Sequence, residues 1–193
     1  MEYPAVLTVR TPERMSNWRP LVQWLLALPH LVVSWALNYL SGAVAVVSWF
    51  AIVFTGRLPE GLANVQAMVI RYSTRASLYA GFLHDSYPPF EFAATPNEPG
   101  GTPVEVWLRP SLYQRNRVSV GFRLILAIPA LLYAMAIGIV GAVCWFLAFF
   151  AVLFTGRWPA GLHAWVTGSQ RVSLRLNVYL SLLTDQYPPY SRD

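Results

Sequence analysis

Two pairs of arginines are the side chains best suited to bind a charged group. Arg71 and Arg75 stand four residues apart, and Arg171 and Arg175 repeat this spacing. Residues four apart share one face of a helix, so each pair presents two neighbouring guanidinium groups. A guanidinium binds phosphate or carboxylate through two parallel hydrogen bonds. Each pair is therefore a candidate clamp for a lipid phosphate, or half of an ion-paired cluster.

The residues alone allow both interpretations. Asp85 and Asp185 recur near the same helices, so the arginines could pair with these acids, bind carbonyls at helix ends, or extend to lipid headgroups. We favour this structural role over a phosphate clamp. Recurring acids near a membrane also suggest a proton relay, and here we favour helix capping and pairing with arginine.

The remaining reactive side chains form no catalytic or metal-binding pattern. His30, His84 and His163 are not at ligand spacing, and none of them recurs in the other half of the chain, whereas a cofactor site in a duplicated protein is expected twice. Cys144 lies in an apolar run and is expected to pack as a small apolar residue. There is no phosphate loop, nucleophile elbow or Cys-x-x-Cys motif. We therefore expect no enzyme, no metal and no cofactor.

The composition is that of a membrane protein. Of 193 residues, 55% are hydrophobic and 12% are charged, half of the roughly 25% charged residues in an average soluble domain. All fourteen cationic residues are arginine. Leu21–Phe54 and Leu124–Phe154 contain no Asp, Glu, Lys or Arg, and each exceeds the roughly 20 apolar residues that span a bilayer. A net charge of +5 beside such runs indicates attraction to anionic lipids rather than nucleic acid.

The chain is a tandem repeat with an offset of one hundred residues. The turn motif Thr55-Gly56-Arg57 returns as Thr155-Gly156-Arg157. The Arg-x-Ser-x-Arg and Asp-x-Tyr-Pro-Pro patterns return at the same offset, which chance similarity between apolar helices would not preserve. We divide the chain into a first unit at 1–92, a linker at 93–103 interrupted by proline and glycine, and a second unit at 104–193.

Both units predict the same order of elements. A strand of alternating residues comes first, at Ala5–Val9 and again at Val104–Leu108, and the two strands could pair with each other outside the bilayer. The long apolar helix follows, with a kink expected at Pro29 or Pro129, and the glycine of the turn motif is placed to end it. A second helix, at about 61–84 and again one hundred residues later, carries the arginine pair and is stopped by Tyr-Pro-Pro.

These motifs resemble a bacterial membrane-domain family of unknown function that is often duplicated. The resemblance rests on Phe-Thr-Gly-Arg-x-Pro-x-Gly-Leu, Arg-x-Ser-x-Arg and Asp-x-Tyr-Pro-Pro-(Phe/Tyr), and it covers both units. It implies a small integral membrane protein and brings no catalytic or ligand residues. The first unit departs from the family pattern at His84 and Ser86, where the second unit has Thr184 and Gln186.

The chain could pass through the membrane in three ways. In the first, which we favour, the arginine-bearing helix returns through the bilayer, so that each unit is a hairpin and the Arg-rich segments and both termini are cytoplasmic, as the positive-inside rule requires. In the second, that helix lies flat on the surface and each unit crosses once. In the third, each apolar run folds into a re-entrant hairpin near Gly42, or near Gly138 and Gly141, and all charged residues stay inside.

The sequence thus predicts an all-α integral membrane protein of two helical-hairpin units, with a small extramembrane cap of strands and polyproline-like tails. We expect a multi-pass protein of the bacterial inner membrane. As its function we expect a non-enzymatic accessory or scaffold subunit that contacts anionic lipid and packs against other membrane subunits or further copies of itself. The alternative is a transporter or lipid-transfer component with a path between the two repeats.

Overall fold

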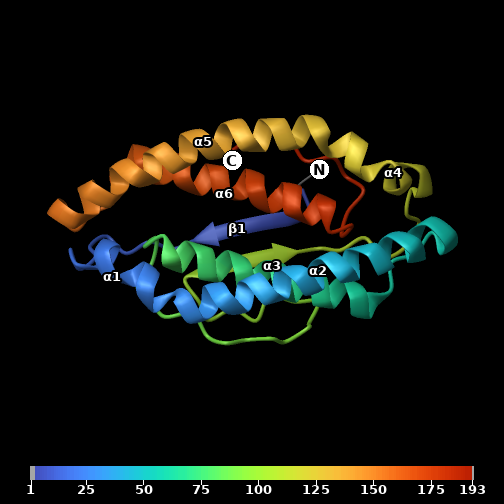
Figure 1. Ribbon diagram of the computed structural model, residues 1–193, viewed down its shortest axis with the longest axis horizontal. Coiled ribbons are helices and arrows are strands. Elements are labelled where there is room, and N and C mark those ends of the chain that lie inside the picture. Colours follow the sequence, from blue (N-terminus) through green and yellow to red (C-terminus); the bar gives the residue numbers. More distant parts are fainter. Residues whose placement is uncertain (1–2, 193) are drawn as a thin grey trace.

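The two repeats form matching sets of helices on either side of a two-stranded sheet. The computed structural model describes residues 3–192. The first unit contains β1 (Ala5–Val9), α1 (Arg19–Leu26), α2 (Leu28–Thr55) and α3 (Glu60–Ala80). The second contains β2 (Val104–Leu108), α4 (Arg117–Gly121), α5 (Arg123–Thr155) and α6 (Ala160–Leu180). In Figure 1, α2 and α5 run along the long axis of the molecule, with α3 and α6 beside them and β1 between the two halves.

The two units exchange their N-terminal segments. β1 and β2 pair antiparallel, with Leu7 opposite Val106, so the predicted pairing of the strands is confirmed. However, β1 contacts α6, β2 contacts α3 and α4 contacts α2, whereas α1 contacts both α3 of its own unit and α5 of the other. The main core accordingly combines buried residues of both units, including Ile70 from α3 and Val178 from α6. The divisions 1–92 and 104–193 describe the repeat in sequence, but neither of them closes a core of its own.

The turn glycines end the long helices as predicted. Gly56 and Gly156 follow α2 and α5 with φ of +71° and +66°, a left-handed conformation that favours glycine. The kink expected near Pro29 takes the form of a break at Ala27 that separates α1 from α2. In the second unit α5 continues through Pro129. Both arginine-bearing helices end four residues earlier than predicted.

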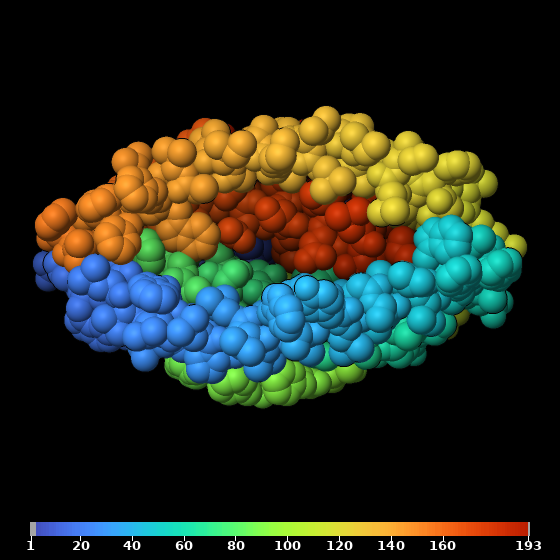
Figure 2. Space-filling model, viewed as in Figure 1, coloured from blue at the N-terminus to red at the C-terminus, as the bar shows by residue number. Residues whose placement is uncertain are grey.

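The long helices expose their apolar side chains. In α2, His30, Ser34 and Ser48 are buried, whereas Trp35 is 64% exposed. In α5 the buried positions are mostly small residues, whereas Leu124 is 77% exposed. Figure 2 shows both helices on one broad face of the molecule, along its two long edges and separated by a hollow. Both are long and apolar enough to cross a membrane, judged by length and composition.

Candidate functional site

The arginine pair of α3 lies on the face of that helix that packs on β2. The Nε atom of Arg71 donates to the carbonyl of Val106 (3.3 Å), and that of Arg75 donates to the carbonyl of Val104 (3.3 Å). Four residues of a helix rise about 6 Å and two residues of a strand about 6.6 Å, so the spacings match. Both arginines are buried, with 2% and 4% of their surfaces exposed.

Two carboxylates neutralise this pair, one from the linker and one from the end of the first unit. The Glu98 side chain has no exposed surface, and its carboxylate contacts Nε of Arg71 (3.3 Å) and Nη2 of Arg75. The carboxylate of Glu91 accepts a hydrogen bond from Nη1 of Arg75 at 2.9 Å. The pair is therefore ion-paired, as one interpretation expected, but with Glu91 and Glu98 and not with the recurring aspartates.

Asp185 binds arginines that precede α5 or begin it, rather than the arginine pair of α6. Arg115 donates to its carboxylate through Nε (2.9 Å) and Nη2 (2.8 Å), and Arg123 donates through Nη2 (2.5 Å). Burial alone would raise the pKa of Asp185, but the hydrogen bonds from Arg115 and from a backbone N–H hold the pKa below its usual value. Asp185 is therefore ion-paired, but with Arg115 and Arg123 and not with the arginines of α6 that were expected to bind it.

Asp85 occupies the equivalent place in the first unit and has no ion pair among the described residues. Its side chain is exposed, and Arg19 donates only to its backbone carbonyl (2.7 Å). Met15 and Gln23 stand where the second unit has its two aspartate-binding arginines. Gln23 donates instead to the carbonyl of His84 (2.5 Å). The expected pairing of Asp85 with the arginines of α3 is therefore wrong, because linker carboxylates hold those arginines.

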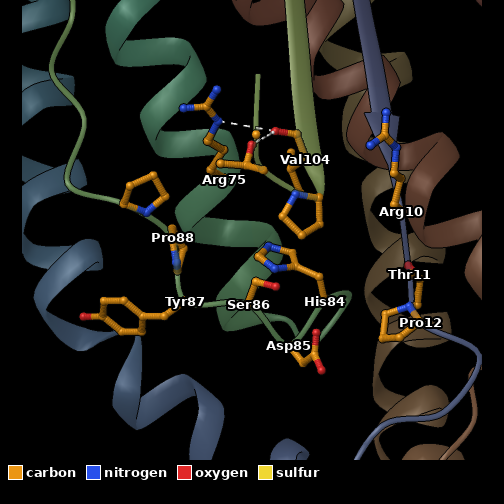
Figure 3. A pocket seen from close by; sticks show the side chains of 14 residues that line it. Arg10, Thr11, Pro12, Arg75, His84, Asp85, Ser86, Tyr87, Pro88 and Val104 are labelled. Atoms are coloured by element: carbon orange, nitrogen blue, oxygen red, sulfur yellow. Dashed lines mark hydrogen bonds between the residues drawn. The ribbon is translucent and has the colours of Figure 1, made fainter. Parts of the chain in front are cut away.

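A pocket of about 690 Å³ opens beside Asp85, near the ends of both strands. Figure 3 shows the ring of His84 inside it, with Asp85 below the ring and Arg10 on the opposite wall. Burial lowers the pKa of His84 to about 4, so the ring is neutral at neutral pH. Arg10 is already paired with Glu105 at 3.0 Å. No group of three metal-binding side chains occurs within residues 3–192, and the pocket presents no activated nucleophile.

The arginines of α6 face β1 across a second pocket. Arg171 donates through Nε to the carbonyl of Leu7 (3.5 Å), and Arg175 donates through Nη1 to the carbonyl of Ser191 (2.9 Å). The pocket has a volume of about 510 Å³ and is lined by these arginines, Tyr3 and residues of β1. In the part of the chain that the structure describes, no carboxylate pairs with Arg171.

A polar cleft separates the two units on the apolar face. Its volume is about 410 Å³ and it lies among α2, α3 and α6, where Figure 2 shows the surface hollowed between the two long helices. Its polar lining consists of uncharged side chains: Ser34, Asn38, Ser73, Thr74, Ser77, Gln170, Ser173 and Asn177. Ser73 and Ser173 are repeat counterparts, so the cleft lies where the two units meet.

The repeated turn motif serves the fold. In both Thr55-Gly56-Arg57 and Thr155-Gly156-Arg157, the threonine hydroxyl accepts the N–H of the arginine at 3.2 Å. The glycine carbonyl then accepts an N–H from the other unit, that of Arg115 in the first copy (3.1 Å) and that of Met15 in the second (2.8 Å). Each motif therefore ends one helix and fastens the exchanged segment of its neighbour.

Each repeat unit matches the same family model. The family model described as Domain of unknown function (DUF4389) matches residues 17–91 and 117–191. The chain belongs to this family. The two DUF4389 matches begin one hundred residues apart, which confirms the tandem duplication. Both strands and Glu98 lie outside the DUF4389 matches. No curated protein and no solved structure matches the chain.

Proposed function

We propose that this protein is a non-enzymatic scaffold that lies in the plane of a membrane, with the face formed by α2 and α5 in the lipid. The observation that carries the proposal is the reversed burial of α2, which hides His30, Ser34 and Ser48 and exposes residues such as Trp35 and Phe50. In water, each exposed apolar Å² forgoes about 25 cal/mol of burial free energy. Lipid removes this surface from water without any rearrangement.

The packing of α3 favours an in-plane orientation over the hairpin expected from charge bias. The linker contacts the middle of α3 through Arg71, which binds Thr95, and through Arg75, which binds Glu98. If α3 crossed the bilayer, the irregular linker would lie at mid-depth, where lipid-exposed loops do not occur. At 1.5 Å per residue, α2 is about 42 Å long and α5 about 50 Å, longer than a hydrocarbon core of about 30 Å. Lying flat, both helices reach lipid while the linker faces water.

Arginines near the ends of the long helices are the proposed contacts with anionic headgroups. Arg57 and Arg157 follow α2 and α5 and are exposed, and Arg117 is exposed at the start of α4. Each arginine near an anionic surface contributes about 1 kcal/mol. Trp18 and Trp24 are also exposed and suit the headgroup region. These residues replace the arginine pairs as the lipid contacts of the scaffold.

Cysteine labelling in sealed vesicles tests the orientation. In a Cys144→Ala background, single cysteines replace Arg57, Thr95 and Arg157, and a membrane-impermeant maleimide is added from one side. We expect all three sites to react from the same side. A control cysteine at Ala43, on the exposed surface of α2, should be shielded by lipid. Labelling of the two arginine sites from the side opposite to Thr95 would support the spanning hairpin and reject the in-plane proposal.

The polar cleft supports a second candidate function, the transfer of lipid along a path between the repeats. Uncharged polar groups in an otherwise apolar face are suited to hold a headgroup while acyl chains stay in lipid. The test is transfer of a fluorescent phospholipid between liposomes, with Asn38→Leu and Ser173→Leu as variants that close the cleft. A scaffold gives no transfer above the protein-free rate, whereas a lipid-transfer protein gives transfer that both variants reduce.

A further inference from the structure

The first unit contains its own bound acidic segment. Arg71 donates through Nη1 to the carbonyl of Thr95 (2.7 Å) and through Nη2 to the carbonyl of Pro96 (3.0 Å). The carboxylate of Glu98 contacts both arginines of α3 and also accepts the N–H of Val106 at 3.1 Å. Two backbone carbonyls and one carboxylate, all within four residues, therefore accept hydrogen bonds from the arginine pair and from the outer edge of β2.

The second unit presents the same kinds of donor on β1. Leu7 lies directly opposite Val106 in the sheet. The N–H and carbonyl of Val106 point away from β1, toward Glu98 and Arg71. In an antiparallel pair of this type, the opposite residue also directs both groups outward. The carbonyl of Leu7 accordingly accepts from Arg171, and its N–H faces the same outer edge.

This second set of donors adjoins an open pocket. Its volume is about 510 Å³, and Arg171 and the residues of β1 line it. Within residues 3–192, Arg171 has no carboxylate partner, whereas its counterpart Arg71 has Glu98. Positive charge in a concave site attracts an anionic ligand.

We propose that this pocket binds an extended acidic peptide of a partner protein, with a glutamate carboxylate on Arg171 and the preceding backbone carbonyls on the same guanidinium. The linker supplies the template, Thr-Pro-Asn-Glu at residues 95–98. A peptide fits better than a lipid because the described lining of the pocket comes from the β1 segment and α6, and includes no residue of α2 or α5, the helices of the apolar face. The inference rests on the proposed function in one respect: the partner protein is one that the scaffold binds.

Binding of a synthetic peptide to the full chain in detergent tests this inference. The probe has the sequence of residues 91–101, Glu-Phe-Ala-Ala-Thr-Pro-Asn-Glu-Pro-Gly-Gly, with a fluorophore at its N-terminus, and binding is followed by anisotropy. We expect saturable binding that Arg171→Gln weakens about tenfold or more, because hydrogen bonds to a charged group are lost. Arg14→Gln removes the same charge at an exposed site outside the lining of the pocket and should leave the affinity unchanged.

A second peptide separates binding from folding of the variant. With glutamine in place of the glutamate that corresponds to Glu98, the probe should bind the unaltered protein about tenfold more weakly. Equal affinity for both peptides, or no binding, would overturn the proposal.

Binding of inorganic phosphate without peptide would show a simple anion site and also overturn it. So would peptide binding found only in an Asp193→Asn variant, because the occupant would then belong to the chain itself. None of these outcomes depends on the orientation in the membrane, which the labelling experiment decides separately.

Discussion

At the scale of single residues, the two recurring aspartates show how the repeats have diverged. Asp185→Asn should lower the free energy of unfolding by about 3 kcal/mol, because Arg115 and Arg123 are then buried without a counter-charge. The loss should shrink as the pH falls through the folded pKa of Asp185, since the unaltered carboxyl is then protonated as well. Thermal unfolding in detergent measures both effects.

Asp85→Asn is the matched control for this substitution. The Asp85 side chain is exposed and has no ion pair among residues 3–192, so its Tm should equal that of the unaltered protein. Equal destabilisation by the two substitutions would contradict the assignment of the ion-paired role to Asp185 alone.

His84 should make the stability of the protein depend on pH. Its pKa is about 4 in the folded protein because of burial, against 6.5 ordinarily. The unfolded chain therefore takes up a proton that the folded chain does not, and stability is lost as the pH falls from about 6.5 to about 4, by about 3 kcal/mol. His84→Thr copies the second unit and should make this decline shallower by the part that His84 contributes, while His30 and His163, whose pKa values burial also lowers, keep theirs. The measurement is Tm against pH for both proteins, and an equally steep decline in the variant would contradict it.

The sequence located the cations of the candidate sites but not their partners. The spacing of Arg71 and Arg75 shows directly that they share a helix face, because helical geometry is local. Glu98 is fully buried in a linker without periodicity, and only the folded arrangement of α3 and β2 brings it to the arginines. The position of Glu98 before β2, the strand on which Arg71 packs, was the only usable signal.

At the scale of elements, one glycine sets the distance between α5 and α6. A Cβ atom at Gly141 would collide with the side chain of Ser169, whereas one at Gly138 would meet no atom within 4 Å. Gly141→Ala should therefore lower the stability by about 1–3 kcal/mol through overpacking. Gly138→Ala should be neutral or stabilising by up to about 1 kcal/mol, because alanine is the better helix former. Equal chemical-denaturation midpoints for the two variants would show that the helices can separate without loss.

Element boundaries were predictable where the signal was local. The strand bounds and the glycine ends of α2 and α5 agree with the structure. The end of α3 does not, because Phe82 (φ +50°), rather than the neighbouring Gly81, adopts the left-handed conformation. Gly81 is required for a different reason, since a Cβ atom there would overlap the ring of Trp145. That contact joins the two units, so it is invisible to any local pattern.

At the scale of the whole molecule, the duplication was evident from sequence and the exchange between units was not. Both strands have the same alternating pattern, so nothing local decides that β1 packs on α6 and β2 on α3. Composition likewise indicated a membrane protein. The spanning hairpin was favoured by the positive-inside rule, which treats the arginines as free charges. In the fold, Arg71, Arg75, Arg115 and Arg123 are ion-paired within the protein, so they no longer bear on the orientation.

The exchange predicts that the two units fold only together. Residues 1–92 and 93–193, expressed separately, should each lack a cooperative thermal transition, because Glu98 and β2 are missing from the first fragment and β1 from the second. Co-expressed, they should form a one-to-one complex that survives purification through a tag on either fragment.

Substitution within the fragments locates the contact that joins them. Glu98→Gln in the second fragment should weaken the complex by about tenfold or more, since it removes a buried charged partner of Arg71 and Arg75 from across the break. Glu105→Gln, which alters a pair whose arginine is 70% exposed, should weaken it far less. Dissociation constants from dilution of the labelled complex provide the measurement. If each fragment alone melts cooperatively as a monomer, the units are independent domains and their exchanged segments do not hold the fold together.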